Sequence, residues 1–91
     1  MKLSLGRIVL VKGIESNGQS VQPAMINRVW GTADTSEGPQ GANVTVFPDC
    51  AAPLFRGSVM VHETEELGDA ANKAGVDLGH KPVFAYWPPK A

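Results

Sequence analysis

The chain has 91 residues and a hydrophobic content of 43%, which fits a single small globular domain spanning residues 1–91. Its formal net charge of -1 excludes binding to nucleic acid or to anionic membranes that is driven by overall charge. The single cysteine, Cys50, excludes an intramolecular disulfide and is typical of a reducing compartment.

The first residues, MKLSLGRIVLVKG, do not match an export signal, because Arg7 interrupts the apolar run and no cleavage site follows. The run is also too short to cross a bilayer. We therefore expect a protein of the cytoplasm, or of a particle assembled there, with no membrane partner.

Residues 7–13 form the first predicted strand. Ile8 and Leu10 share one face of it, and Val9 and Val11 share the other. Apolar residues on both faces predict a strand that is covered on two sides. One cover is the core of the domain, and the other is a loop or a partner subunit.

Residues 24–30 form the second predicted strand, and the sequence leaves its facing open. The favoured arrangement buries Met25 and Val29, and the alternative points Ile26 and Trp30 inward. A shift of one residue in the pairing exchanges the two faces of a strand. The pattern therefore predicts the strand but not its register.

Two loops flank this second strand. Residues 15–20 contain the Asn17-Gly18 pair, a strong turn signal, in a loop that we expect to be longer than a tight hairpin and to project. Residues 31–41 have no apolar periodicity and are rich in Gly, Ser, Thr and Pro. We expect this segment to be an irregular loop and the most mobile part of the chain.

The chain is organised around a predicted central hairpin. In residues 42–55, Val44 and Val46 alternate with polar residues, as in a half-buried strand. Proline has no backbone donor and aspartate favours turns, so Pro48 and Asp49 end this strand. A second apolar run begins at residue 54 and predicts the returning strand.

A short helix is predicted after this hairpin, over about residues 63–75. Leu67, Ala70, Ala71 and Ala74 recur at helical spacing, and the glutamates at the start suit a helix N-terminus. Gly68 weakens the helix by about 1 kcal/mol relative to alanine.

Residues 83–87 form the last predicted strand, which Pro88 and Pro89 end. The total is five strands and one helical insertion. This order predicts a mainly β fold, a small five-stranded SH3-like barrel.

No catalytic set stands out among the titratable residues. Cys50, His62 and His80 form no recognisable nucleophilic group, and we expect Cys50 to be a small buried residue. The acidic run at residues 62–66 matches no metal-ligand spacing and is typical of a solvated helix start. Neighbouring carboxylates lie beside no pocket-forming apolar stretch. We therefore predict no enzymatic activity, no metal site and no cofactor.

Aromatic residues and arginines are the more informative set. Five rings lie at or near predicted strand ends with two arginines close by: Trp30, Phe47, Phe55, Tyr86 and Trp87, with Arg28 and Arg56. A planar ring beside a guanidinium group can stack a base and hold a phosphate. The candidate ligand-binding residues are therefore Arg28, Trp30, Arg56 and Trp87. The alternative is that the rings form the core that a small barrel requires.

Several segments, in their order along the chain, resemble a family of short, mostly uncharacterised proteins of tailed bacteriophages. They are GRIVLV (6–11), PAMINRVW (23–30), NVTVFPD (43–49), FRGSVMV (55–61) and FAYWP (84–88). The family supplies no agreed catalytic residues. A second resemblance, of residues 6–9, is to the KOW-type barrel of ribosomal and transcription proteins. The near-neutral charge and the absence of lysine clusters argue against RNA binding.

The phage resemblance implies a protein that acts in the host cytoplasm, where several classes of small phage protein sequester nucleotide-derived immune signals. We therefore expect a non-enzymatic anti-defence protein that binds a cyclic nucleotide-type ligand. One alternative is a structural or decoration protein of the virion. Another is an inhibitor of a host protein that uses the acidic residues 63–69. In each case we expect a homo-oligomer, because a small barrel with a two-sided apolar strand gains stability by symmetric association.

Overall fold

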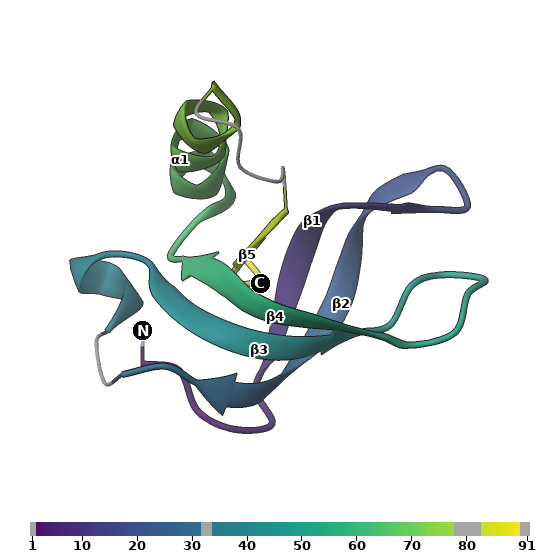
Figure 1. Cartoon of the computed structure of the whole chain (residues 1–91), viewed down its shortest axis with the longest axis horizontal. Coiled ribbons are helices and arrows are strands. Elements are labelled where there is room, and N and C mark those ends of the chain that lie inside the picture. Colours follow the sequence, from purple (N-terminus) through teal and green to yellow (C-terminus); the bar gives the residue numbers. More distant parts are fainter. Residues whose placement is uncertain (1, 32–33, 78–82, 90–91) are drawn as a thin grey trace.

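The computed structural model describes residues 2–31, 34–77 and 83–89. Its strands are β1 (Ile8–Ser16), β2 (Gln19–Val29), β3 (Gln40–Val46), β4 (Leu54–His62) and β5 (Phe84–Tyr86), with a 3-10 helix η1 (Thr35–Glu37) and an α-helix α1 (Glu65–Asp77). The strands close into a barrel in the order β1-β2-β3-β4-β5 (Figure 1). This confirms the predicted mainly β fold with five strands and one short helix, and it is consistent with a small SH3-like barrel.

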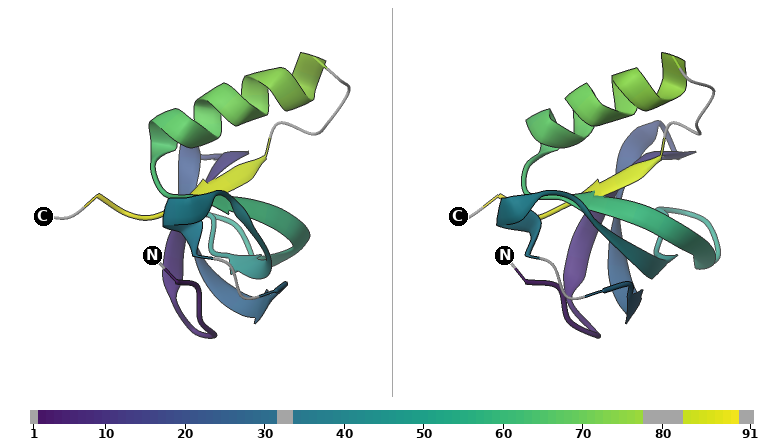
Figure 2. Two further views of the ribbon diagram at one scale, coloured as in Figure 1. Left: turned by 90° about the vertical axis from the view of Figure 1, so that its left-hand side faces the viewer. Right: turned by 60° about the vertical axis from the view of Figure 1, so that its left-hand side comes forward.

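The closure of the barrel explains why the chain contains a helix. Consecutive strands from β1 to β4 pair antiparallel, and β5 pairs antiparallel with β1 but parallel with β4. A closed ring with an odd number of strands cannot alternate throughout, so one neighbouring pair must be parallel. A parallel pair requires a long crossover, commonly a helix. The helix α1 provides this crossover and lies across the outside of the barrel, next to β5 (Figure 2).

The facing of β2 corrects the favoured sequence interpretation. Ala24 and Ile26 are buried in the barrel core, whereas Met25 is 37% exposed. A register shift in the pairing with β3 lies between Ile26 and Arg28, and beyond it Val29 packs against the core. The prediction of a buried Met25 was wrong, because Ala24 and Ile26 occupy the inward positions on either side of it. Val29 is half-buried, because the shift moves the inward position by one residue.

The connection between β1 and β2 is also shorter than predicted. The two strands are joined at Asn17 and Gly18, whose φ angles are 53° and 76°. These left-handed values are those of a type I′ turn, which joins two strands with only two residues. The Nδ2 group of Asn17 donates to Oδ2 of Asp49 at 2.9 Å, and Ser16 donates to the Asp49 carbonyl. The tip of this hairpin is therefore attached to the β3–β4 turn.

Regular structure occupies part of the segment that the sequence predicts as an irregular loop. Asp34 caps η1 by accepting the Ser36 N–H at 2.9 Å, and β3 already begins at Gln40. The prediction was therefore wrong for the second half of residues 31–41. Residues 32 and 33 lie outside the described residues.

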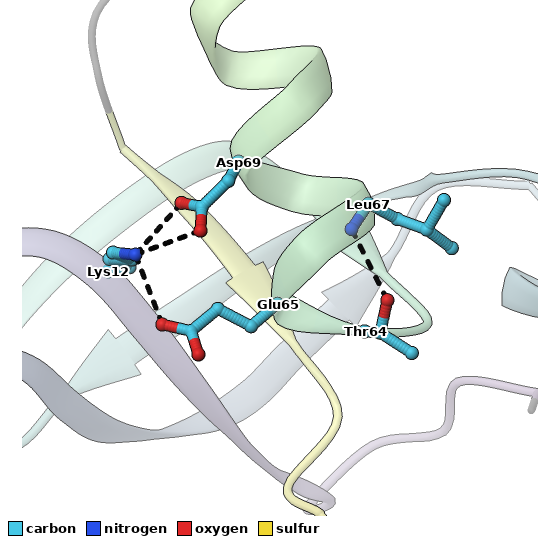
Figure 3. Close-up of polar contacts among 5 residues, drawn as sticks. All are labelled: Lys12, Thr64, Glu65, Leu67 and Asp69. Atoms are coloured by element: carbon cyan, nitrogen blue, oxygen red, sulfur yellow. Dashed lines mark hydrogen bonds and ion pairs between the residues drawn. The ribbon is translucent and has the colours of Figure 1, made fainter.

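The helix α1 has its predicted length, but its apolar residues at helical spacing are not buried against the barrel. Leu67, Ala70, Ala71 and Ala74 are exposed, and the helix meets the barrel at the buried Gly68. Thr64 caps the helix by accepting the Leu67 N–H at 3.2 Å (Figure 3).

An ion-pair cluster joins the first turns of α1 to the barrel. Lys12 of β1 lies with its Nζ 3.1 Å from Glu65 Oε2 and 2.9 Å from Asp69 Oδ1 (Figure 3). The two carboxylates raise the pKa of Lys12, the Asp69 hydrogen bond having the larger effect. Two contacts therefore attach the helix to the barrel. One is the close approach of its backbone at Gly68, and the other is the pair of salt bridges from Lys12 to Glu65 and Asp69.

Candidate functional site

Two of the candidate ligand-binding residues lie together at the end of β2. The guanidinium carbon of Arg28 lies 4.2 Å from the centroid of the Trp30 ring, within the range of a cation–π contact. The Trp30 Nε1–H donates to Oδ1 of Asn43 on β3 at 3.0 Å. The ring is 42% exposed but fixed in orientation, so it offers a preorganised aromatic surface.

Asn43 also connects this pair to β4. Its Oδ1 accepts a second hydrogen bond, from the backbone N–H of Ser58 at 2.9 Å. Ser58 has a φ of 55° and lies where the β3–β4 register shifts, between Ala42 and Val44. One amide oxygen therefore holds both the irregular part of β4 and the indole of Trp30.

Gly41 lies beside both Trp30 and Met60 on the outer surface of the sheet. A Cβ atom at Gly41 would lie 3.6 Å from two atoms of Trp30 and 3.9 Å from the sulfur of Met60. Trp30 and Met60 therefore flank Gly41, and Met60 borders the cleft described next.

A cleft of about 660 Å³ separates α1 from β4 and lies within the size range of small-molecule sites. Its lining includes the rings of Phe55, His62 and Phe84, with Arg56 and Met60. Arg56 is the only permanently charged side chain among the lining residues that the structure describes. The cleft therefore combines apolar and aromatic walls with one fixed positive charge.

The acidic residues of this region lie outside the cleft. Glu65 and Asp69 are held by Lys12 on the side of β1. A second groove of about 380 Å³, between η1 and α1, contains Glu37 and Glu63. The two grooves share His62, and the positive charge of Arg56 favours an anion at its end of the cleft.

His62 lies where the two grooves meet. Its side chain is largely buried, and its ring packs edge-on against Phe84 with centroids 5.8 Å apart and an interplanar angle of 88°. Burial lowers the pKa of His62 below its usual value, because the apolar surroundings disfavour the charged form. The imidazole is therefore neutral at pH 7.

Trp87, the fourth candidate, lies apart from the other three residues. It belongs to the core cluster and is only 6% exposed. Its Nε1–H donates to Oγ1 of Thr35 at 2.7 Å, and Arg7 lies 5.3 Å from the centroid of its ring. The alternative interpretation of the rings as core therefore holds for Trp87, which we exclude from the site.

The sequence interpretation of the site missed Asn43, His62 and Phe84. Asn43 acts through contacts across β2, β3 and β4, and no spacing along the chain indicates such contacts. His62 and Phe84 come together only when the crossover through α1 places β5 beside β4.

Cys50 differs from its prediction, because the residue is exposed rather than buried. It has a φ of 57° and lies beside Asp49 in the β3–β4 turn. In residues 2–31, 34–77 and 83–89, no three His, Cys, Asp or Glu side chains are grouped so that they could hold a metal ion. No helix in the described part of the chain is long and apolar enough to cross a membrane.

Fold and site together define a small closed β-barrel with an aromatic, cation-lined cleft under its crossover helix. No family model matches this chain, and neither the curated proteins nor the solved structures contain a match to it. The bacteriophage resemblance therefore stays a prediction.

Proposed function

We propose that this protein is a phage-encoded, non-enzymatic binding protein that captures a nucleotide-derived signal of host defence. One observation carries the ligand class: the described lining of the cleft combines aromatic rings with a single fixed charge, the cation Arg56. A planar base suits the ring walls, and a phosphate suits the guanidinium group, which can bind it through two parallel hydrogen bonds. The viral origin rests on the resemblance of the sequence segments alone.

The Arg28–Trp30 pair supports a ligand with more than one base or phosphate. The pair lies beside the cleft, because Met60 contacts the Gly41 position on one side and lines the cleft on the other. Stacking on an aromatic side chain contributes about 1–3 kcal/mol for each base. A cyclic dinucleotide or trinucleotide could place one unit in the cleft and another against Trp30.

Titration calorimetry with cyclic dinucleotides, cyclic trinucleotides and cyclic ADP-ribose isomers tests the proposal. We expect saturable heat with at least one of these compounds. The absence of heat with all of them would overturn the nucleotide ligand.

A matched pair of variants locates the site. The Arg56→Met change keeps the apolar stem and removes the charge, and we expect it to weaken binding about tenfold or more. The Lys73→Met change removes a similar charge from an exposed residue of α1 that does not line the cleft, and it is expected to leave the affinity unchanged. Equal effects of the two changes would place the ligand elsewhere.

A further inference from the structure

The outward side of β1, β2 and β3 carries two adjacent rows of uncharged side chains, which we call the outer apolar face. It consists of Ile8, Leu10, Pro23, Met25, Thr45 and Phe47. In the first row, Ile8 pairs with Met25, and Met25 pairs with Thr45. In the second row, Leu10 pairs with Pro23, whose carbonyl accepts the Phe47 N–H at 2.9 Å.

The barrel core does not use this face. Val9, Ala24 and Val46, which alternate with its residues along the strands, point inward and are fully buried. On β5 the next neighbour of Leu10 is Tyr86, which is buried and packs beside Phe84, the ring that lies against Gly68 of α1. The helix therefore covers the outside of the barrel at β5 and leaves β1 to β3 exposed.

We propose that the outer apolar face is a two-fold interface with a second copy of this chain. None of its six residues is charged, so a nucleic acid or a charged peptide would find no counter-charge there. An identical face supplies the same uncharged, apolar surface, as a two-fold contact requires. The face lies on the surface of β1, β2 and β3, which are paired with one another, so the contact is face to face rather than by strand addition.

The exposed area fits a modest dimer. Ile8, Met25 and Phe47 expose 47%, 37% and 41% of their surface. At about 200 Å² for a large side chain, these three contribute roughly 250 Å² of apolar surface, and Leu10 and Pro23 raise this to about 350 Å². The largest apolar patches on typical monomers measure about 300–600 Å² and are often functional, and this face lies at the lower end of that range.

Two such faces would bury twice this area on association. At an interface about 60% apolar, the total buried surface is roughly 1,200 Å², the lower limit for a stable specific contact. We therefore expect a dimer that dissociates in the micromolar range. The face shares no residue with the cleft lining, so this inference does not depend on the proposed ligand.

Sedimentation equilibrium of the full chain from low to high micromolar concentration tests the interface. We expect a concentration-dependent dimer for the native sequence. The Met25→Glu change should make the protein monomeric, because each copy would bury a charge against the other. The control is Leu67→Glu, which places the same charge at a 56% exposed apolar residue on α1, and it should dimerise normally.

A second variant keeps the test decisive if Met25→Glu fails to fold. Phe47→Ser removes an exposed ring at the end of β3, and it should weaken the dimer at least tenfold while the circular dichroism spectrum is unchanged. A native protein that stays monomeric at high micromolar concentration would overturn the inference. A dimer that Phe47→Ser leaves intact would also overturn it, even if the cleft binds its ligand.

Discussion

A Cβ atom placed on Gly68 would lie 2.0 Å from Cε2 of Phe84, so the backbone of α1 rests directly on the ring of the last strand. Phe84 also packs against His62 and lines the cleft. The contact that attaches the helix to the barrel therefore also sets the position of one wall of the candidate site.

Replacing Gly68 with alanine should separate helix propensity from packing. Alanine favours an exposed helix by about 1 kcal/mol over glycine, but here its methyl group overlaps a buried ring. We expect a net destabilisation of about 1–3 kcal/mol, because α1 must move away from Phe84. Urea unfolding measures this change, and Ala74→Gly at an exposed helical position measures the propensity effect alone. An increase in stability in Gly68→Ala would show that α1 does not pack as described.

Removing the charge of Lys12 should loosen the helix with a small loss of stability. In Lys12→Met, Glu65 and Asp69 lose their shared cation. The side chains are 31%, 40% and 50% exposed, so solvent screens the ion pairs, and we expect a loss of only about 0.5–1 kcal/mol. High salt should reduce the difference from the native protein. Faster amide hydrogen exchange in α1, absent in Lys73→Met, would confirm the role of the cluster.

His62 should make the fold sensitive to mild acid. Its pKa in the folded protein lies below the ordinary 6.5, so the unfolded chain binds more protons as the pH falls. The contribution of His62 to folding stability is therefore fully present above 6.5, the pKa of histidine in the unfolded chain. It is lost as the pH falls below 6.5 toward the lower pKa of the folded protein. Urea unfolding at about pH 7.5 and about pH 5 should show this loss, and His62→Gln should reduce it. An equal pH dependence in the variant would assign the effect to other groups.

Replacing the two tryptophans by phenylalanine should have opposite effects: one change should reduce mainly the stability, and the other mainly the ligand affinity. Trp87→Phe removes the hydrogen bond to Thr35 and leaves a void in the core, so we expect a loss of about 2–4 kcal/mol with the cleft intact. Trp30→Phe affects an exposed ring, so it should cost less than about 1 kcal/mol but weaken ligand binding. Chemical unfolding and calorimetry on both proteins measure these effects. Loss of binding in Trp87→Phe without loss of stability would return Trp87 to the site.

The number and order of the strands could be predicted from the sequence because apolar alternation and turn residues are local signals. Val44 and Val46 point into the core as the alternation indicates. The facing of β2 could not be predicted, since the register shift near Ile26 depends on the pairing with β3. The apolar spacing in α1 was misleading, because the helix packs through Gly68 rather than through its alanines.

For the site, the sequence by itself determined which chemical groups are available: the rings and guanidinium groups that point to an anionic, planar ligand. Only the tertiary structure decided which of them meet. It places Arg28 against Trp30, puts Arg56 in the cleft and buries Trp87 beside Thr35. The contacts of Arg56 and Trp87 join segments far apart in the chain, through a barrel closure whose parallel β4–β5 pair requires the crossover through α1. Arg28 and Trp30 are close in the chain, but the indole is oriented by Asn43 of the neighbouring strand β3.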